Sequence, residues 1–104
     1  MTEEQEVYLK IGQQLEDSIE SQMFGKPCFK TQGKAYMAFF ENEMVFKLVG
    51  DMHSEALNLE GSQLFDPSNK KRPMREWVQV PYTSEQEWKK YAQAARQYVL
   101  SKYK

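Results

Sequence analysis

The chain has 104 residues, of which 40% are hydrophobic and 28% are charged, and its formal net charge is −1. These values are typical of one globular domain and exclude a disordered chain. The single cysteine, Cys28, excludes an intrachain disulfide. Residues 1–6 are acidic and polar, unlike a secretory signal, and no apolar run approaches the roughly 18 residues of a membrane span. We therefore expect one cytoplasmic domain over residues 1–104, with no membrane partner.

A four-residue apolar spacing predicts a first helix over about residues 3–21. Thr2 and Gln5 resemble a capping box that would begin this helix. The apolar stripe that the helix would bury consists of Val7, Ile11, Leu15, Ile19 and Met23.

Residues 24–31, 35–41 and 44–49 are predicted to form three consecutive strands. The second and third are rich in aromatic and branched residues, and Asn42 and Glu43 lie between them as a tight turn. We therefore expect an antiparallel meander.

The rest of the chain predicts a helix over about residues 52–60, strands over 62–65 and 74–80, and a last helix that starts at Thr83 or Ser84. Strands grouped between helices indicate the α+β class. The predicted fold is a two-layer α-β(3)-α-β(2)-α arrangement with one antiparallel five-stranded sheet. Its core would include Leu15, Ile19, Phe39, Phe46, Leu48, Trp88, Ala92 and Val99.

Two short motifs occur within this order of elements. One begins the first predicted strand and the other runs through the last: Met23, Phe24 and Gly25, then Pro73, Met74, Trp77, Val80 and Pro81. With the aliphatic and aromatic hairpin between them, they resemble the TfoX N-terminal domain family over about residues 15–104. The resemblance implies a fold like that of type III secretion chaperones and brings no catalytic residues. Because family members include the N-terminal half of regulators of natural competence, it also implies a regulatory role.

The sequence contains no recognisable catalytic or metal-binding pattern. His53 is the only histidine, and no second histidine or cysteine lies near it, whereas a metal site needs three or four ligands. Cys28 would need a base and an orienting group to act as a nucleophile. The five glycines form no phosphate-binding loop. We therefore expect a non-enzymatic protein with no cofactor and no metal.

The densest cluster of charge lies at the predicted tip of the last hairpin and consists of Lys70, Lys71, Arg72 and Arg75. A basic tip of this kind can contact the phosphates of a nucleic acid. Alternatively, it is a solvated tip whose charges discourage aggregation through strand edges.

The predicted strand at 35–41 is apolar on both faces. If Asn42 and Glu43 form a two-residue turn, strand alternation places one group on the helix side: Met37, Phe39, Met44, Phe46 and Leu48. The other face then carries Tyr36, Ala38, Phe40, Val45, Lys47 and Val49. No helix covers this face in a two-layer fold, so the pattern predicts an exposed protein-interaction surface at Tyr36, Phe40, Val45, Lys47 and Val49. The alternative is that a helix end or a chain terminus folds over it.

These observations favour a binding or regulatory module that acts through protein–protein contact, with a protein partner or by self-association. Transcriptional or competence-type regulation is the setting that the family resemblance implies. The alternative is a nucleic-acid-associated protein that uses the basic tip at residues 70–75.

Overall fold

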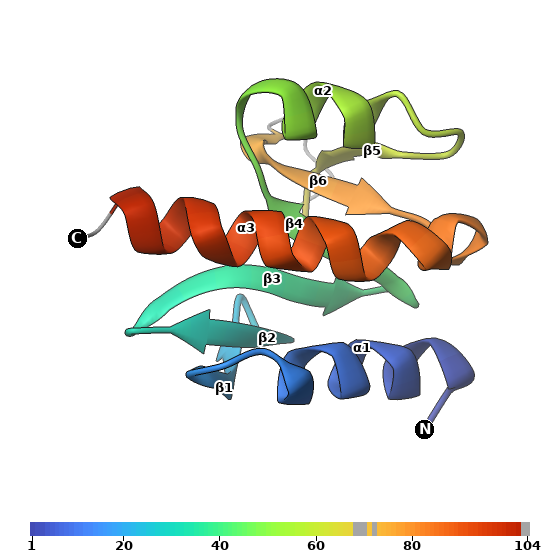
Figure 1. The fold of residues 1–104 in the computed structure, drawn as a ribbon. Coiled ribbons are helices and arrows are strands. Elements are labelled where there is room, and N and C mark those ends of the chain that lie inside the picture. The colour runs from blue at the N-terminus through green and yellow to red at the C-terminus, as the bar shows by residue number, and fades with distance from the viewer. Residues whose placement is uncertain (68–70, 72, 103–104) are drawn as a thin grey trace.

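The computed structural model describes residues 1–67, 71 and 73–102. Within these residues, three α-helices, a 3-10 helix and six strands form two layers, with the α-helices on one side of the sheet (Figure 1). In chain order the elements are α1 (Glu3–Gln14), β1 (Ser18–Met23), β2 (Lys26–Thr31), β3 (Lys34–Phe40), β4 (Glu43–Lys47), α2 (Gly50–Leu57), β5 (Gln63–Phe65), β6 (Met74–Val80), η1 (Tyr82–Glu87) and α3 (Trp88–Lys102).

All neighbouring strands pair antiparallel, in the order β1-β2-β3-β4-β6-β5. The predicted α+β class and antiparallel sheet are therefore confirmed. The sheet has six strands rather than the five expected, and the additional strand is β1. Strand β6 has the predicted bounds, and β3, β4, β5 and α2 differ from their predicted bounds by a few residues.

The predicted helix over 3–21 is wrong in its second half. Helix α1 ends at Gln14, and Asp17 adopts a positive φ of 57° just before β1 begins. A spacing of four residues fits one face of a strand as well as one face of a helix, because four is a multiple of two. Ile19 and Met23 therefore continue the apolar spacing as residues of β1.

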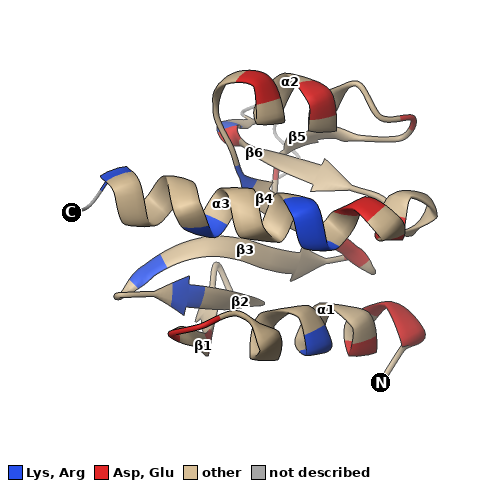
Figure 2. Cartoon of the chain, in the orientation of Figure 1, with Lys and Arg blue, Asp and Glu red and all other residues tan. Residues whose placement is uncertain are grey.

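Thr2 caps α1 as predicted, because its hydroxyl accepts a hydrogen bond from the Gln5 backbone N–H at 3.1 Å. The same hydroxyl donates to the Asn42 side chain at 3.0 Å, which ties the start of α1 to the turn between β3 and β4. The first turn of α1 is acidic (Figure 2), and negative charge is favoured at this end of a helix dipole.

The main core lies between the sheet and the helices. The predicted members Phe39, Phe46, Leu48, Trp88, Ala92 and Val99 are all buried there. In α1 the buried residues are Tyr8, Ile11 and Gly12. The predicted burial of Leu15 and Ile19 is wrong, because Leu15 is only partly buried and Ile19, which lies in β1, is 68% exposed. The buried face of α1 therefore differs from the predicted apolar stripe, because Tyr8 rather than Val7 contacts the aromatic rings of Phe29 and Phe39.

Helix α1 approaches β2 closely at Gly12. A methyl group at this position would overlap the ring of Phe29, which is itself buried beneath the helix. Glycine normally weakens a helix interior relative to alanine, so its presence here is explained by the space that the ring occupies.

We predict that Gly12→Ala destabilises the protein by about 1–3 kcal/mol despite the better helix propensity of alanine, because overpacking displaces Phe29 or α1. Gln13→Ala, at the neighbouring exposed position, is the control and should change stability by no more than about 0.5 kcal/mol. Urea denaturation measures both. A Gly12→Ala variant as stable as the wild type would contradict this account of the contact.

The phenol of Tyr8 is buried in the main core, and this burial raises its pKa above the ordinary value of about 10. In the unfolded chain Tyr8 ionises near that ordinary value. Ionisation therefore favours the unfolded state, so the contribution of Tyr8 to stability is present below pH 10 and is lost as the pH rises above it.

We predict that thermal stability falls above about pH 10 and that Tyr8→Phe reduces this loss, because phenylalanine cannot ionise. Circular dichroism measures the melting temperatures of both proteins at a series of alkaline pH values. Identical alkaline slopes for the two proteins would show that Tyr8 does not cause the loss.

Candidate binding surface on the second face of the sheet

The sheet face opposite the helices carries a second apolar cluster. Its buried members come from five of the strands and are Cys28, Ala38, Val45, Phe65 and Trp77. Met23, Ala35, Phe40 and Met74 pack against them. All these residues lie on strands, so among the described residues this cluster is built by the sheet itself, without a helix.

The sheet curls toward this second face. Phe40 on β3 and Phe65 on β5 are separated by two intervening strands, and three interstrand steps in a flat sheet span about 14 Å. Their ring centroids nevertheless lie 5.3 Å apart in an edge-on contact. This curvature brings the two halves of the sheet together and explains how side chains without a covering helix become buried.

The expected exposed patch on this face is therefore wrong in part. Val45 is fully buried within the second cluster, and Phe40 is half-buried against Phe65. Lys47 is also half-buried, with its ammonium 5.9 Å from the ring centroid of Trp77. Of the five residues expected there, Val49 is exposed, but it lies beyond the end of β4. The expectation failed because it assumed a flat sheet.

Tyr36 lies on the opposite side from the one predicted. Phe29 pairs with Met37 and Lys30 pairs with Ala35, so the register shifts and Tyr36 is left between the two pairs. This bulge interrupts the alternation of side chains and turns Tyr36 into the main core. Its hydroxyl hydrogen-bonds there with the hydroxyl of Ser18 on β1.

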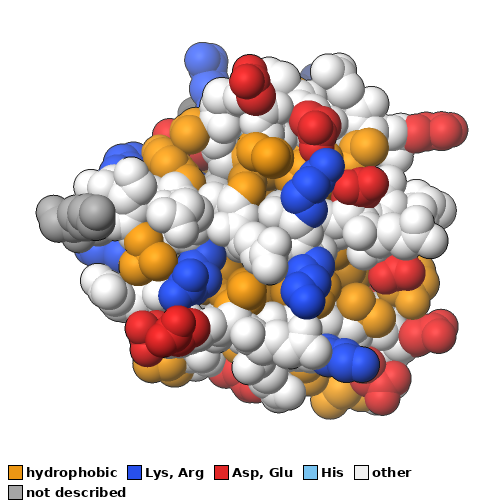
Figure 3. Space-filling model, in the orientation of Figure 1, with side chains coloured by type: hydrophobic (Ala, Val, Ile, Leu, Met, Phe, Trp, Pro, Cys, Tyr) orange, Lys and Arg blue, Asp and Glu red, His pale blue; other side chains and the backbone are white. Residues whose placement is uncertain are grey.

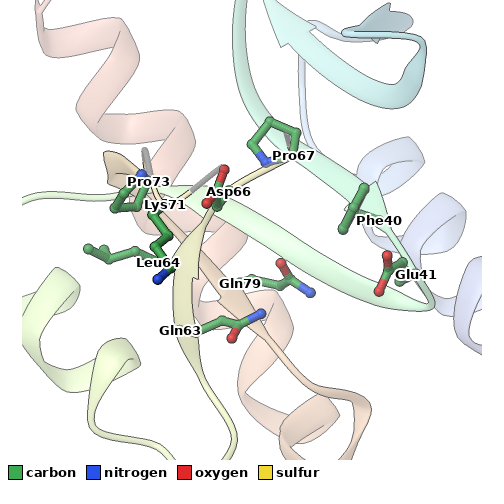
Figure 4. A pocket seen from close by; sticks show the side chains of 9 residues that line it. All are labelled: Phe40, Glu41, Gln63, Leu64, Asp66, Pro67, Lys71, Pro73 and Gln79. Atoms are coloured by element: carbon green, nitrogen blue, oxygen red, sulfur yellow. The ribbon is translucent and has the colours of Figure 1, made fainter. Parts of the chain in front are cut away.

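A hollow of about 660 Å³ opens beside the second cluster, between β3, β5, β6 and the segments next to them (Figure 4). It is lined by Phe40, Glu41, Gln63, Leu64, Asp66, Pro67, Lys71, Pro73 and Gln79. Its size lies within the range of ligand pockets. Four of these side chains are apolar, and the others include two amides and two carboxylates.

The two amides belong to directly paired strand positions, because Gln63 of β5 lies opposite Gln79 of β6. Gln79 is buried, and its amide N–H donates to a Glu43 carboxylate oxygen at 2.7 Å. That hydrogen bond fixes its orientation, whereas Gln63 is exposed at the edge strand. The sequence reasoning missed both residues, because a glutamine in a strand has no distinctive signal without knowledge of its neighbours.

The structure describes two of the four residues of the predicted basic group. Lys71 is exposed and lines the hollow, and Arg75 is exposed on β6. Lys70 and Arg72 lie outside the described residues. Nucleic-acid binding by this group stays a prediction.

The other two candidate chemical groups, the thiol of Cys28 and the imidazole of His53, make contacts that fit a role in the fold. Burial raises the pKa of the Cys28 thiol, so the sulfur is held as an uncharged core group. The Nε2 of His53 lies 2.7 Å from the carbonyl oxygen of Arg75, which accepts its hydrogen bond when that nitrogen carries the proton. Among residues 1–67, 71 and 73–102, no group of three or more His, Cys, Asp and Glu side chains could hold a metal ion.

The helix side of the molecule presents a different surface. Hydrophobic side chains appear there in small groups separated by charged and polar ones (Figure 3). Lys90 on α3 makes ion pairs with Glu55 on α2 and with Glu87, and the Tyr91 hydroxyl donates to Glu55 at 2.7 Å. These contacts lower the pKa of Glu55 and connect α2 to α3.

No helix in the described part of the chain has both the length and the apolar character to cross a membrane.

Comparison with known proteins found no matching family model, no similar curated protein and no similar solved structure. The resemblance to TfoX N-terminal domains stays a prediction that rests on the motifs at residues 23–25 and 73–81.

We predict that Phe40→Asp destabilises the protein by about 2–4 kcal/mol, because it removes the contact with Phe65 and places a carboxylate against the second cluster. Phe40→Leu, which keeps an apolar side chain, should be less destabilising. Urea denaturation of the two variants distinguishes these effects. A Phe40→Asp variant with the stability of the wild type would mean that Phe40 does not contribute to the packing of this face.

Proposed function

We propose that this chain is a small, non-enzymatic binding module that acts through contact with another protein, and that the hollow beside β5 and β6 receives part of that partner. The observation that carries the proposal is the composition of the hollow. It combines an apolar wall with two neighbouring amides on a sheet face that has no covering helix in the described structure.

A protein segment suits this hollow for two reasons. Gln63 belongs to β5, an end strand of the sheet, so the hollow lies beside an edge that no other described strand covers. The exposed amide of Gln63 offers both donors and an acceptor, which match the N–H and C=O groups of an extended backbone, whereas the buried Gln79 amide already donates to Glu43. Phe40 and the two prolines provide apolar contact for a side chain of that segment.

We place this contact in regulation, with transcriptional or competence-type control as the setting, and in the cytoplasm. The support for this setting is the resemblance of Met23, Phe24 and Gly25, and of the motif in β6, to the TfoX N-terminal domain family. The hollow itself supports binding and does not depend on that setting.

The direct test introduces a photoreactive amino acid at Gln63 in cells that express the protein. We expect ultraviolet light to yield one discrete cross-linked protein, which mass spectrometry identifies, because Gln63 lines the hollow (Figure 4) and is exposed. The matched control places the same amino acid at Gln93, an exposed glutamine on α3, where we expect no such product.

A second variant, Lys71→Glu, reverses a charge in the hollow at an exposed position and should leave the melting temperature unchanged. Combined with the photoreactive group at position 63, it should remove the cross-linked product. Equal products from positions 63 and 93, or a product that survives Lys71→Glu at full yield, would contradict binding in the hollow.

A further inference from the structure

Strand β1 is an end strand of the sheet and pairs only with β2 among the described elements. Its outer edge therefore carries backbone N–H and C=O groups that no other described strand reaches. After Met1, the two most exposed large apolar side chains belong to this strand and the turn after it: Ile19, within β1, is 68% exposed, and Phe24, directly after β1, is 62% exposed. Both the backbone and the side chains of this edge are thus available for contact.

The edge lacks the features that usually keep strand edges apart. The segment Ser18–Met23 has no proline, lysine or arginine, and Glu20 is its only charge. The opposite edge of the sheet is formed by β5, which has only three residues. Short strands and charged residues protect edges from pairing, and β1 has six residues with little charge.

Phe24 adopts an unfavourable backbone conformation that keeps its ring outside the core. It occupies the first position of the two-residue turn between β1 and β2 with a φ of 54°, followed by Gly25 at 74°. Such turns favour Asn-Gly, because both positions need a positive φ. An exposed aromatic side chain at a position that favours asparagine is better explained by contact with another molecule than by the stability of this turn.

We propose that β1 pairs antiparallel with β1 of a second copy of this chain, about a two-fold axis at Ser21, so that the two sheets become continuous. In this register Ile19 of each copy lies opposite Met23 of the other, and Glu20 lies opposite Gln22. Phe24 comes to the position opposite Ser18. Each contact occurs twice, as the symmetry of such an interface requires.

Neighbouring registers are less favourable. An axis at Glu20 places the two Glu20 carboxylates directly opposite each other, and like charges in that position are destabilising. An axis between Glu20 and Ser21 places Ile19 opposite the polar Gln22. Of these three registers, only the one with its axis at Ser21 places the apolar Ile19 opposite the apolar Met23 and the carboxylate of Glu20 opposite the amide of Gln22.

This self-association is independent of the proposed partner site, because the hollow lies by the β5 end of the sheet and β1 forms the other end. The two proposals therefore succeed or fail separately. Cross-linking at Gln63 tests the first, and the oligomeric state of the purified chain tests the second.

Sedimentation equilibrium of the wild-type chain should show a reversible monomer–dimer equilibrium. Ile19→Lys and Phe24→Asn should shift it to monomer, because they remove the exposed apolar side chains. Met52→Asn changes an exposed apolar residue on α2 and serves as the matched control that leaves the equilibrium unchanged. Phe24→Asn should also keep or raise the melting temperature, since Asn-Gly suits the turn, so loss of the dimer cannot be attributed to unfolding.

The register has its own test in Gln22→Lys. The introduced ammonium would lie opposite Glu20 of the other copy, and we expect the dimer to become at least about twofold tighter at low salt, with two symmetric pairs gained. Hydrogen exchange of residues 18–23 should slow as protein concentration rises. A wild-type chain that stays monomeric, an Ile19→Lys variant that stays dimeric, or a Gln22→Lys variant that is not tighter would each overturn the proposal as stated.

Discussion

Three tight turns in succession determine the shape of this protein. Each of the hairpins β1–β2, β2–β3 and β3–β4 closes with two residues, and both residues of every turn have a positive φ. Turns of this kind match the right-handed twist of the strands they connect, so three in series build a strongly twisted sheet. The twist lets the sheet fold over its own second face, which buries Val45 and Trp77 and leaves the hollow beside them.

The sequence is sufficient to predict those parts of the fold that depend on local pattern. The predicted turn at residues 42–43 is wrong by one position, because the turn lies at 41–42 and Phe40 pairs with Glu43. This error shifts the pairing by two residues, which leaves each side chain on its face, so alternation along β3 and β4 still places Met37, Phe39, Met44 and Phe46 in the main core. The residues of β6 and the cap at Thr2 are also predicted by short-range signals. In each case the side chains that decide the structure are neighbours in the sequence.

The remaining features depend on contacts between distant segments. The contact of Phe40 with Phe65 requires the curvature of the whole sheet, and no local pattern reports curvature. The position of Tyr36 depends on a one-residue shift against β2, which no property of β3 alone reveals. Gln63 and Gln79 become a pair only because β5 returns beside β6. Apart from strand β1, which was predicted as helix, the sequence lacked information on long-range register rather than on element type.

Because the only cysteine of the chain is buried in the second apolar cluster, its reactivity reports how often this part of the sheet opens. Cys28 is shielded by the curl of the sheet and lies opposite Ser21 on the end strand β1. A reagent can reach its sulfur only when the edge hairpin moves away from the cluster, whereas the helix layer can stay in place. The rate at which this thiol is labelled under native conditions therefore measures how often the outer strands separate from the rest of the sheet, without any engineered probe.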